Sequence, residues 1–182
     1  MRVISGSARG LKLESLAGSD TRPTLDRVKE AVFSMLYNKC AGANVLDLFA
    51  GSGALGIECL SRGAKMCTFA DNNAAAIGVI QKNLQKTRMS GKAYVVKADC
   101  NAFLAQHSNK SYNLIFLDPP YATGKTGEVT AILQLIYNGG MLSGGGYIVL
   151  ECDKNFSPDI PDCFNVVKNK TYGRVHILIL EA

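Results

Sequence analysis

Along most of the chain, short apolar runs alternate with longer stretches in which apolar positions recur at helical spacing. The apolar runs predict strands at about 44–49, 66–70, 93–97, 112–117 and 146–150, and the stretches between them predict helices near 54–62, 73–86, 101–106 and 128–138. Two further runs, 164–172 and 174–180, meet at Tyr172-Gly173 and predict an antiparallel hairpin. This alternation predicts an α/β fold, Rossmann-like, with seven strands that are mostly parallel and a hairpin at the C-terminal end.

Residues 1–40 carry a different pattern and are predicted to form an extension to the unit at 41–182. Residues 1–14 predict a short β-hairpin, and a helix is expected to follow with Thr24 as its N-cap. The apolar stripe of this helix is formed by Leu25, Val28, Val32, Met35 and Leu36, which leaves Arg27, Lys29, Glu30 and Ser34 outside it.

Composition fits one globular unit: 182 residues, of which 47% are hydrophobic and 19% charged. No apolar run approaches the roughly 18 residues of a membrane span, so a cytoplasmic protein without membrane contact is expected. The six cysteines form no CxxC pair and only two histidines are present, which predicts reduced thiols and no metal. Seven basic and four acidic residues lie in 1–40, so this segment suits a polyanion, although a solvated surface gives the same count.

The strongest motif is the segment from Asp47 to Gly56, Asp-Leu-Phe-Ala-Gly-Ser-Gly-Ala-Leu-Gly, in which a strand enters a glycine-rich turn that opens a helix. Its glycines also satisfy GxGxxG, so a nicotinamide enzyme must be considered. The Asp47 carboxylate would repel a pyrophosphate, whereas S-adenosylmethionine brings an ammonium and a sulfonium and no phosphate. The charge pattern therefore favours S-adenosylmethionine, with S-adenosylhomocysteine as the product.

Two further acids follow the next two strands. Asp71 is placed to accept from ribose hydroxyls under either cofactor, and Asp99 from an adenine amino group. Each acid alone could be a solvated strand end or a helix cap. Three acids on successive strand ends beside a glycine turn predict a cofactor site.

The fourth strand ends in Asp118-Pro119-Pro120-Tyr121. Adjacent prolines hold the backbone extended, which leaves the Pro119 carbonyl as a fixed acceptor. Asp118 and this carbonyl are suited to take one N–H each from an exocyclic amino group, while Tyr121 stacks on the base. No cysteine lies in this loop, so a covalent route through a thiolate is not indicated.

These motifs resemble those of the bacterial small-subunit ribosomal RNA guanine-N2 methyltransferases over nearly the whole chain. The specific part is N-terminal: Arg2-Val-Ile-Ser-Gly6, Arg9-Gly-Leu-Lys-Leu13, and Arg22-Pro-Thr24 with Arg27, Glu30 and Phe33. The resemblance implies a class I S-adenosylmethionine-dependent methyltransferase fold and methylation of one guanine N2 in 16S rRNA, within assembled or assembling 30S subunits. A monomer is expected.

The resemblance also assigns residues to roles. Catalytic positions are Asp118, Pro119 and Tyr121; cofactor-binding positions are Asp47, Phe49, Gly51, Gly53, Asp71, Asn72, Asp99 and Cys100. The clustered positive charge of the N-terminal segment indicates Arg9, Arg22 and Arg27 as contacts to RNA phosphates, and Pro120 is expected to contact the RNA as well. One departure is visible, because Asn73 stands where a second acid is expected after Asp71, and a weaker cap or cofactor contact is expected there.

Other functions stay open at this point. A DNA adenine-N6 methyltransferase could use the same loop, but no segment is long enough for a target-recognition insert. Glutamine-modifying protein methyltransferases characteristically carry Asn where this chain has Asp118. A non-catalytic RNA-binding or ribosome assembly factor on the same fold is the alternative from another class.

Overall fold

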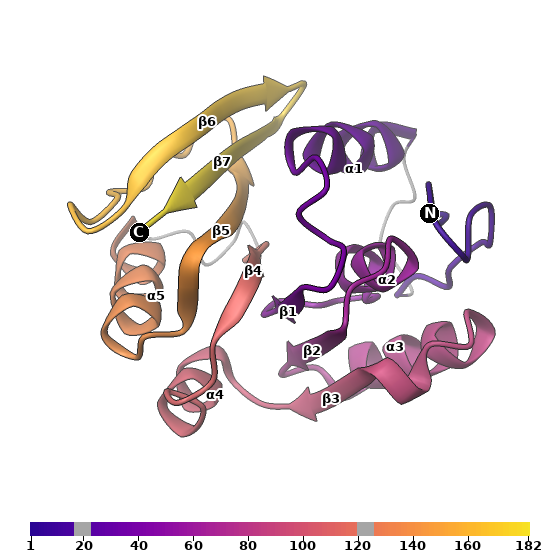
Figure 1. The fold of residues 1–182 in the computed structure, drawn as a ribbon. Helices are drawn as coiled ribbons and strands as arrows, with labels where there is room; N and C mark the ends of the chain where they lie inside the picture. Colours follow the sequence, from indigo (N-terminus) through magenta and orange to yellow (C-terminus); the bar gives the residue numbers. More distant parts are fainter. Residues whose placement is uncertain (17–22, 120–125) are drawn as a thin grey trace.

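A single seven-stranded sheet organises the computed structural model, which describes residues 1–16, 23–119 and 126–182. Its strands are β1 (Asn44–Asp47), β2 (Met66–Asp71), β3 (Ala93–Lys97), β4 (Tyr112–Leu117), β5 (Leu142–Asp153), β6 (Asn165–Tyr172) and β7 (Val175–Glu181). The order across the sheet is β3-β2-β1-β4-β5-β7-β6 (Figure 1). Strands β1 to β5 are parallel, and β7 pairs antiparallel with β5 and β6. The α/β fold and its C-terminal hairpin are therefore confirmed.

Helices cover both faces of this sheet. They are α1 (Pro23–Met35), α2 (Ala54–Ser61), α3 (Ala74–Lys86), α4 (Cys100–Gln106) and α5 (Thr126–Asn138), with a short 3₁₀ turn at Ser90–Lys92. One apolar cluster joins the sheet to α1, α2, α3 and the N-terminal segment, and the other joins it to α4 and α5 (Figure 1). Among the described residues, no helix has the length and apolar character needed to cross a membrane.

The chain reverses its direction of progress across the sheet at β1. The first three strands run outward from β1 through β2 to β3, and the chain then returns to place β4 on the other side of β1. In open α/β sheets, ligands bind beyond the carboxyl ends of the strands at such a switch point. The glycine turn after β1 and the Asp118 loop after β4 flank this point.

Two predicted elements differ from the structure. Strand β5 begins at Leu142 rather than near residue 146, because its Gly144-Gly145-Gly146 run lacks the side chains that make a strand visible in a sequence. The predicted N-terminal hairpin is reduced to one antiparallel bridge between Arg2 and Lys12, supported by backbone hydrogen bonds such as Val3 N to Leu11 O (3.0 Å).

The first helix also differs from expectation. It begins at Pro23, a position that suits the first turn because proline needs no intrahelical partner for a missing N–H, so Thr24 lies inside the helix and does not cap it. Its apolar stripe is confirmed at Val28 and Val32, and Leu36, directly after the end of the helix, is buried with them. The placement of Lys29 outside that stripe was wrong, since Lys29 is only 3% exposed.

Packing of α2 on the sheet depends on Gly56. A Cβ at this position would lie 2.3 Å from a ring carbon of Phe69 and 2.6 Å from Sγ of Cys67, both on β2. We expect Gly56→Ala to lower the free energy of unfolding by about 1–3 kcal/mol, because neither buried side chain has room to move away. Urea denaturation measures the change.

The matched control is Gly78→Ala in α3, where an added Cβ would meet nothing within 4 Å. Alanine is the better helix former, so this variant is expected to gain about 0.5–1 kcal/mol. Equal denaturation midpoints for the two variants would contradict the proposed contact between α2 and β2.

Candidate active site

Three carboxylates leave neighbouring strands on one face of the sheet. The side chains of Val45 and Phe116 belong to the apolar cluster on the α1–α3 side, and alternation along β1 and β4 puts Asp47 and Asp118 on that same side. The same alternation from Val149 places Glu151 there on β5. All three residues line one cavity, which Phe49 and Gly51 of the glycine turn also line.

The glycine turn is braced by two carboxylates. Gly51 and Gly53 have φ angles of +52° and +76°, in the left-handed region that favours glycine, and Gly53 is the N-cap of α2. The Gly51 N–H donates to Oδ2 of Asp71 (2.8 Å), and the Gly56 N–H donates to Oδ2 of Asp47 (3.0 Å). Asp47 and Asp71 therefore fix the path of the turn as well as its charge.

Burial and the charges of neighbouring carboxylates raise the pKa values of Asp47 and Asp118. Burial raises the pKa of Asp47 to about 7, and the nearby charge of Asp71 adds to this increase. The hydrogen bond from the Gly56 N–H acts in the opposite direction and lowers the pKa. Burial likewise raises the pKa of Asp118 well above its ordinary value, and the charges of Glu151 and Asp47 add to the effect. A cavity with this charge pattern suits cations and N–H donors.

Asp71 is followed by two asparagines with different surroundings. Oδ1 of Asp71 accepts from the Asn73 N–H (2.8 Å), and Asn72 is exposed at the strand end. Asn73 is the N-cap of α3, and its side chain accepts from the Ala75 N–H at 2.9 Å. The cap hydrogen bond is therefore made with asparagine at this position, since an amide oxygen accepts as a carboxylate oxygen does.

The third strand end carries Asp99 and Cys100. Asp99 is exposed and is the N-cap of α4, where its Oδ1 accepts from the N–H groups of Asn101 (2.9 Å) and Ala102 (3.3 Å). Cys100 is half-buried, and burial raises its pKa to about 12. Neither residue lines the cavity, nor do Asp71 and Asn72. These four residues lie at or just after the carboxyl ends of the paired strands β2 and β3.

The structure describes only part of the Asp118 loop that follows β4. Pro119 is half-buried directly after Asp118. Pro120 and Tyr121 lie outside the described residues, as does Arg22 in the N-terminal segment. Arg9 and Arg27 are both exposed, as an RNA contact requires.

Helix α1 closes one side of the cavity, which the sequence did not reveal. Val28, Lys29 and Val32 line it together with Met1. The predicted extension thus contributes a wall to the same cavity as Asp47 and Asp118.

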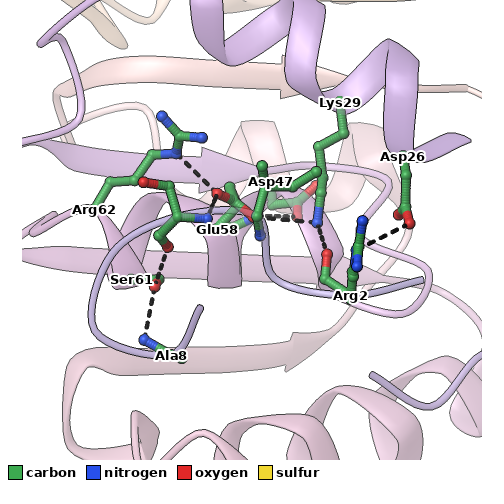
Figure 2. A network of polar contacts seen from close by, with 11 residues as sticks. Arg2, Ala8, Asp26, Lys29, Asp47, Glu58, Ser61 and Arg62 are labelled. Atoms are coloured by element: carbon green, nitrogen blue, oxygen red, sulfur yellow. Dashed lines mark hydrogen bonds and ion pairs between the residues drawn. The ribbon is translucent and has the colours of Figure 1, made fainter. Parts of the chain in front are cut away.

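A buried carboxylate holds this wall in place. Glu58 of α2 is fully buried and accepts from the backbone N–H groups of Ile4 (2.8 Å) and Ser5 (3.0 Å). It also forms ion pairs with Lys29 of α1 (3.1 Å) and Arg62 (2.8 Å), and Lys29 donates in addition to the Arg2 carbonyl (Figure 2). Glu58 therefore joins the N-terminal segment and α1 to the helix that opens at the glycine turn.

A second connection runs through Asn83 of α3, which is fully buried. Its amide oxygen accepts from the Glu14 N–H (2.8 Å), and its amide nitrogen donates to the carbonyls of Glu14 (3.0 Å) and Ser52 (2.9 Å). The N-terminal segment is thus tied to the glycine turn from both sides. The role of Glu58 was not predicted from the sequence. Its only indication there is that an acidic residue stands within the apolar stretch that forms α2.

Comparisons with known proteins agree with this arrangement. The sequence profile of the family described as conserved hypothetical protein 95 matches residues 1–181. Ribosomal RNA small subunit methyltransferase D of Escherichia coli is 36% identical over 96% of this chain and 86% of its own length. The chain belongs to the ribosomal RNA small subunit methyltransferase D family. The resemblance found in the sequence is thereby confirmed.

A second relative and a solved structure are similar to this chain over nearly its whole length. A Bacillus subtilis protein, provisionally designated an rRNA methyltransferase, is 41% identical over 98% of this chain and 97% of its own. A solved Escherichia coli structure, also designated provisionally as a methyltransferase, has a TM-score of 0.85 at 34% identity and covers 99% of this chain and 96% of its own. The class I methyltransferase fold is confirmed.

Proposed function

We propose that the protein transfers a methyl group from S-adenosylmethionine to the N2 amino group of one guanine in 16S rRNA, within assembled or assembling 30S subunits. Membership of the methyltransferase D family supports the reaction and the RNA. The observation that carries the chemistry is one cavity that holds both Asp118 and the glycine turn braced by Asp47. We further propose that the protein acts in the cytoplasm as a monomer.

The charges along the sheet edge fit this cofactor. Asp47, Phe49, Gly51 and Gly53 would hold its amino-acid end, since a buried carboxylate beside left-handed glycines attracts an ammonium and leaves room for close approach. Asp71 and Asn72 would bind the ribose, and Asp99 and Cys100 the adenine. A pyrophosphate would meet carboxylates here, which argues against a nicotinamide cofactor.

Asp118 and the Pro119 carbonyl are the proposed acceptors for the two N–H groups of the guanine amino nitrogen. S-adenosylmethionine, when bound, supplies an electrophilic methyl group on a sulfonium. Held by two acceptors, the amino nitrogen presents its lone pair in one direction, and the Asp118 carboxylate stabilises the positive charge that develops on it. Tyr121, with Pro120 beside it, is proposed to stack on the base.

Cofactor affinity should depend on pH through Asp47. Its folded-state pKa of about 7 means that the carboxylate which attracts an ammonium is largely protonated at pH 6 and largely ionised at pH 8. We expect the affinity for S-adenosylhomocysteine to rise by about tenfold between these two pH values. Titration calorimetry at both values measures it, and in Asp47→Asn the dependence should largely disappear.

The N-terminal arginines are the proposed contacts to RNA phosphates. Neutralising Arg9 or Arg27 is expected to weaken RNA binding. The slope of the logarithm of the binding constant against the logarithm of the salt concentration should fall by about one for each phosphate contact that is lost. Cofactor affinity should stay the same, since both side chains are exposed and neither lines the cavity. A loss of cofactor affinity instead would assign these residues a structural role.

One experiment tests the proposed function directly. Labelled S-adenosylmethionine is offered to undermethylated small subunits, protein-free RNA, DNA and protein in parallel, and the modified nucleotide is mapped by mass spectrometry. We expect label on one guanine of 16S rRNA. Label on DNA would favour an adenine-N6 methyltransferase, and subunit binding without label would favour an assembly factor.

A thermal-shift measurement separates the cofactors. A ligand specific for the folded state adds about 2.7 kcal/mol at a hundred times its dissociation constant. We expect S-adenosylhomocysteine to raise the melting temperature and NAD to leave it unchanged.

A further inference from the structure

Glu151 stands beside Asp118 at the carboxyl edge of the sheet. Strands β4 and β5 are parallel neighbours, and Leu117 is paired with Leu150 in their register. Asp118, directly after β4, and Glu151, within β5, are the next residues and therefore lie at the same level of the sheet. Both line the cavity that the glycine turn also lines.

The two side chains share one environment. Both lie on the face that carries α1, both are half-buried, and the charge of Glu151 raises the pKa of Asp118. Neighbouring strands in a sheet are about 4.8 Å apart. Their side chains therefore enter the cavity from adjacent strands, where two carboxylates can present acceptors to neighbouring groups on the edge of one base.

The chemistry of the bases distinguishes which edge fits. Guanine carries the N1–H donor next to its N2 amino donors, whereas adenine and cytosine carry an unprotonated ring nitrogen next to the amino group. An ionised carboxylate accepts hydrogen bonds and donates none. A pair of carboxylates therefore suits the guanine edge, and would repel the lone pair that adenine or cytosine places beside its amino group.

We propose that Glu151 accepts the N1–H of the target guanine while Asp118 accepts from its N2 amino group, so that Glu151 determines the choice of guanine. The inference rests on the proposed function and extends it to the recognition of the base. It makes Glu151 a specificity-determining residue rather than a further acceptor for the reacting nitrogen.

2-Aminopurine tests this role without any change to the protein, because it keeps the N2 amino group and replaces the N1–H with an acceptor. It also lacks the O6 carbonyl of guanine, so the comparison with a Glu151 variant assigns the preference to the N1–H. Small-subunit RNA with 2-aminopurine at the mapped position is prepared by ligation and reconstituted with subunit proteins. We expect the wild-type protein to prefer guanine by about ten- to a hundredfold in kcat/KM, the effect of one charge-assisted hydrogen bond.

The variant Glu151→Gln supplies the second arm. A glutamine amide both donates and accepts, so the preference for guanine over 2-aminopurine is expected to fall to within about threefold. Asp153→Asn is the matched control, since Asp153 lies two residues further along β5 and does not line the cavity. This control should keep the wild-type preference.

The outcomes separate this inference from the proposed function. Failure of the wild-type protein to methylate any guanine overturns the proposed function. Methylation of guanine with equal use of 2-aminopurine overturns the role of Glu151 alone, whether or not the variant folds. A Glu151→Gln protein that keeps its preference but loses affinity for S-adenosylhomocysteine assigns Glu151 to the cofactor and overturns the inference as well.

Discussion

Asp118→Ala is expected to lower turnover by about ten- to a hundredfold or more, because it removes a charge-assisted hydrogen bond of roughly 1.5–3 kcal/mol to the reacting amino group. The fold should stay intact. Burial and the charges of Glu151 and Asp47 raise the pKa of Asp118 above its ordinary value, so its ionisation costs stability in the folded state. That cost grows as the pH rises above the ordinary value of the group.

The same substitution is therefore expected to leave the melting temperature at neutral pH unchanged or to raise it. Single-turnover methylation and thermal unfolding measure the two effects on one preparation. Asp118→Asn is the companion variant, since it keeps the shape and one acceptor while it removes the charge. Turnover that is unchanged in Asp118→Ala would remove this residue from the reaction.

Glu58→Ala is expected to lower the free energy of unfolding by about 3–5 kcal/mol, the usual cost of removing one member of a buried ion pair. Its removal leaves Lys29 buried without its carboxylate and takes the acceptor from the Ile4 and Ser5 N–H groups. Burial lowers the pKa of Lys29 and Glu58 raises it, so the loss of Glu58 should also make Lys29 easier to deprotonate.

Urea denaturation measures this destabilisation, and Glu30→Ala is the matched control. Glu30 lies on α1 and is exposed, so its removal is expected to change the stability by less than about 0.5 kcal/mol. Cofactor affinity in Glu58→Ala reports whether the wall formed by α1 stays in place. Equal stability of the two variants would mean that the network around Glu58 contributes little.

The sequence predicted the parts of the fold that depend on local pattern. Helical and strand spacing located the elements from β1 to β7, and strand-end acids with glycines located the edge that holds Asp47, Asp71 and Asp118. Contacts between distant segments could not be predicted in the same way. Lys29 and Glu58 can be buried because they neutralise each other. They belong to different helices, and the local pattern of either helix gives no sign of the charged partner on the other.

Glu151 escaped prediction for a different reason. Its place beside Asp118 follows from the pairing of β4 with β5, which the apolar pattern does not specify. The first residues of β5 were not predicted for a local reason, since three consecutive glycines show no alternation of apolar and polar side chains. A site residue whose position depends on the order of the strands can be identified only from the three-dimensional structure.

The contacts of the N-terminal segment have a consequence for the order in which the protein folds. The bonds from Ile4 and Ala8 to α2 span 54 and 53 residues, and the bond from Glu14 to Asn83 spans 69. During synthesis the segment leaves the ribosome first, whereas these partners emerge more than fifty residues later. During synthesis its docking therefore cannot precede the emergence of α2 and α3, so the wall of the cavity that α1 supplies can be completed only after the glycine turn has left the ribosome.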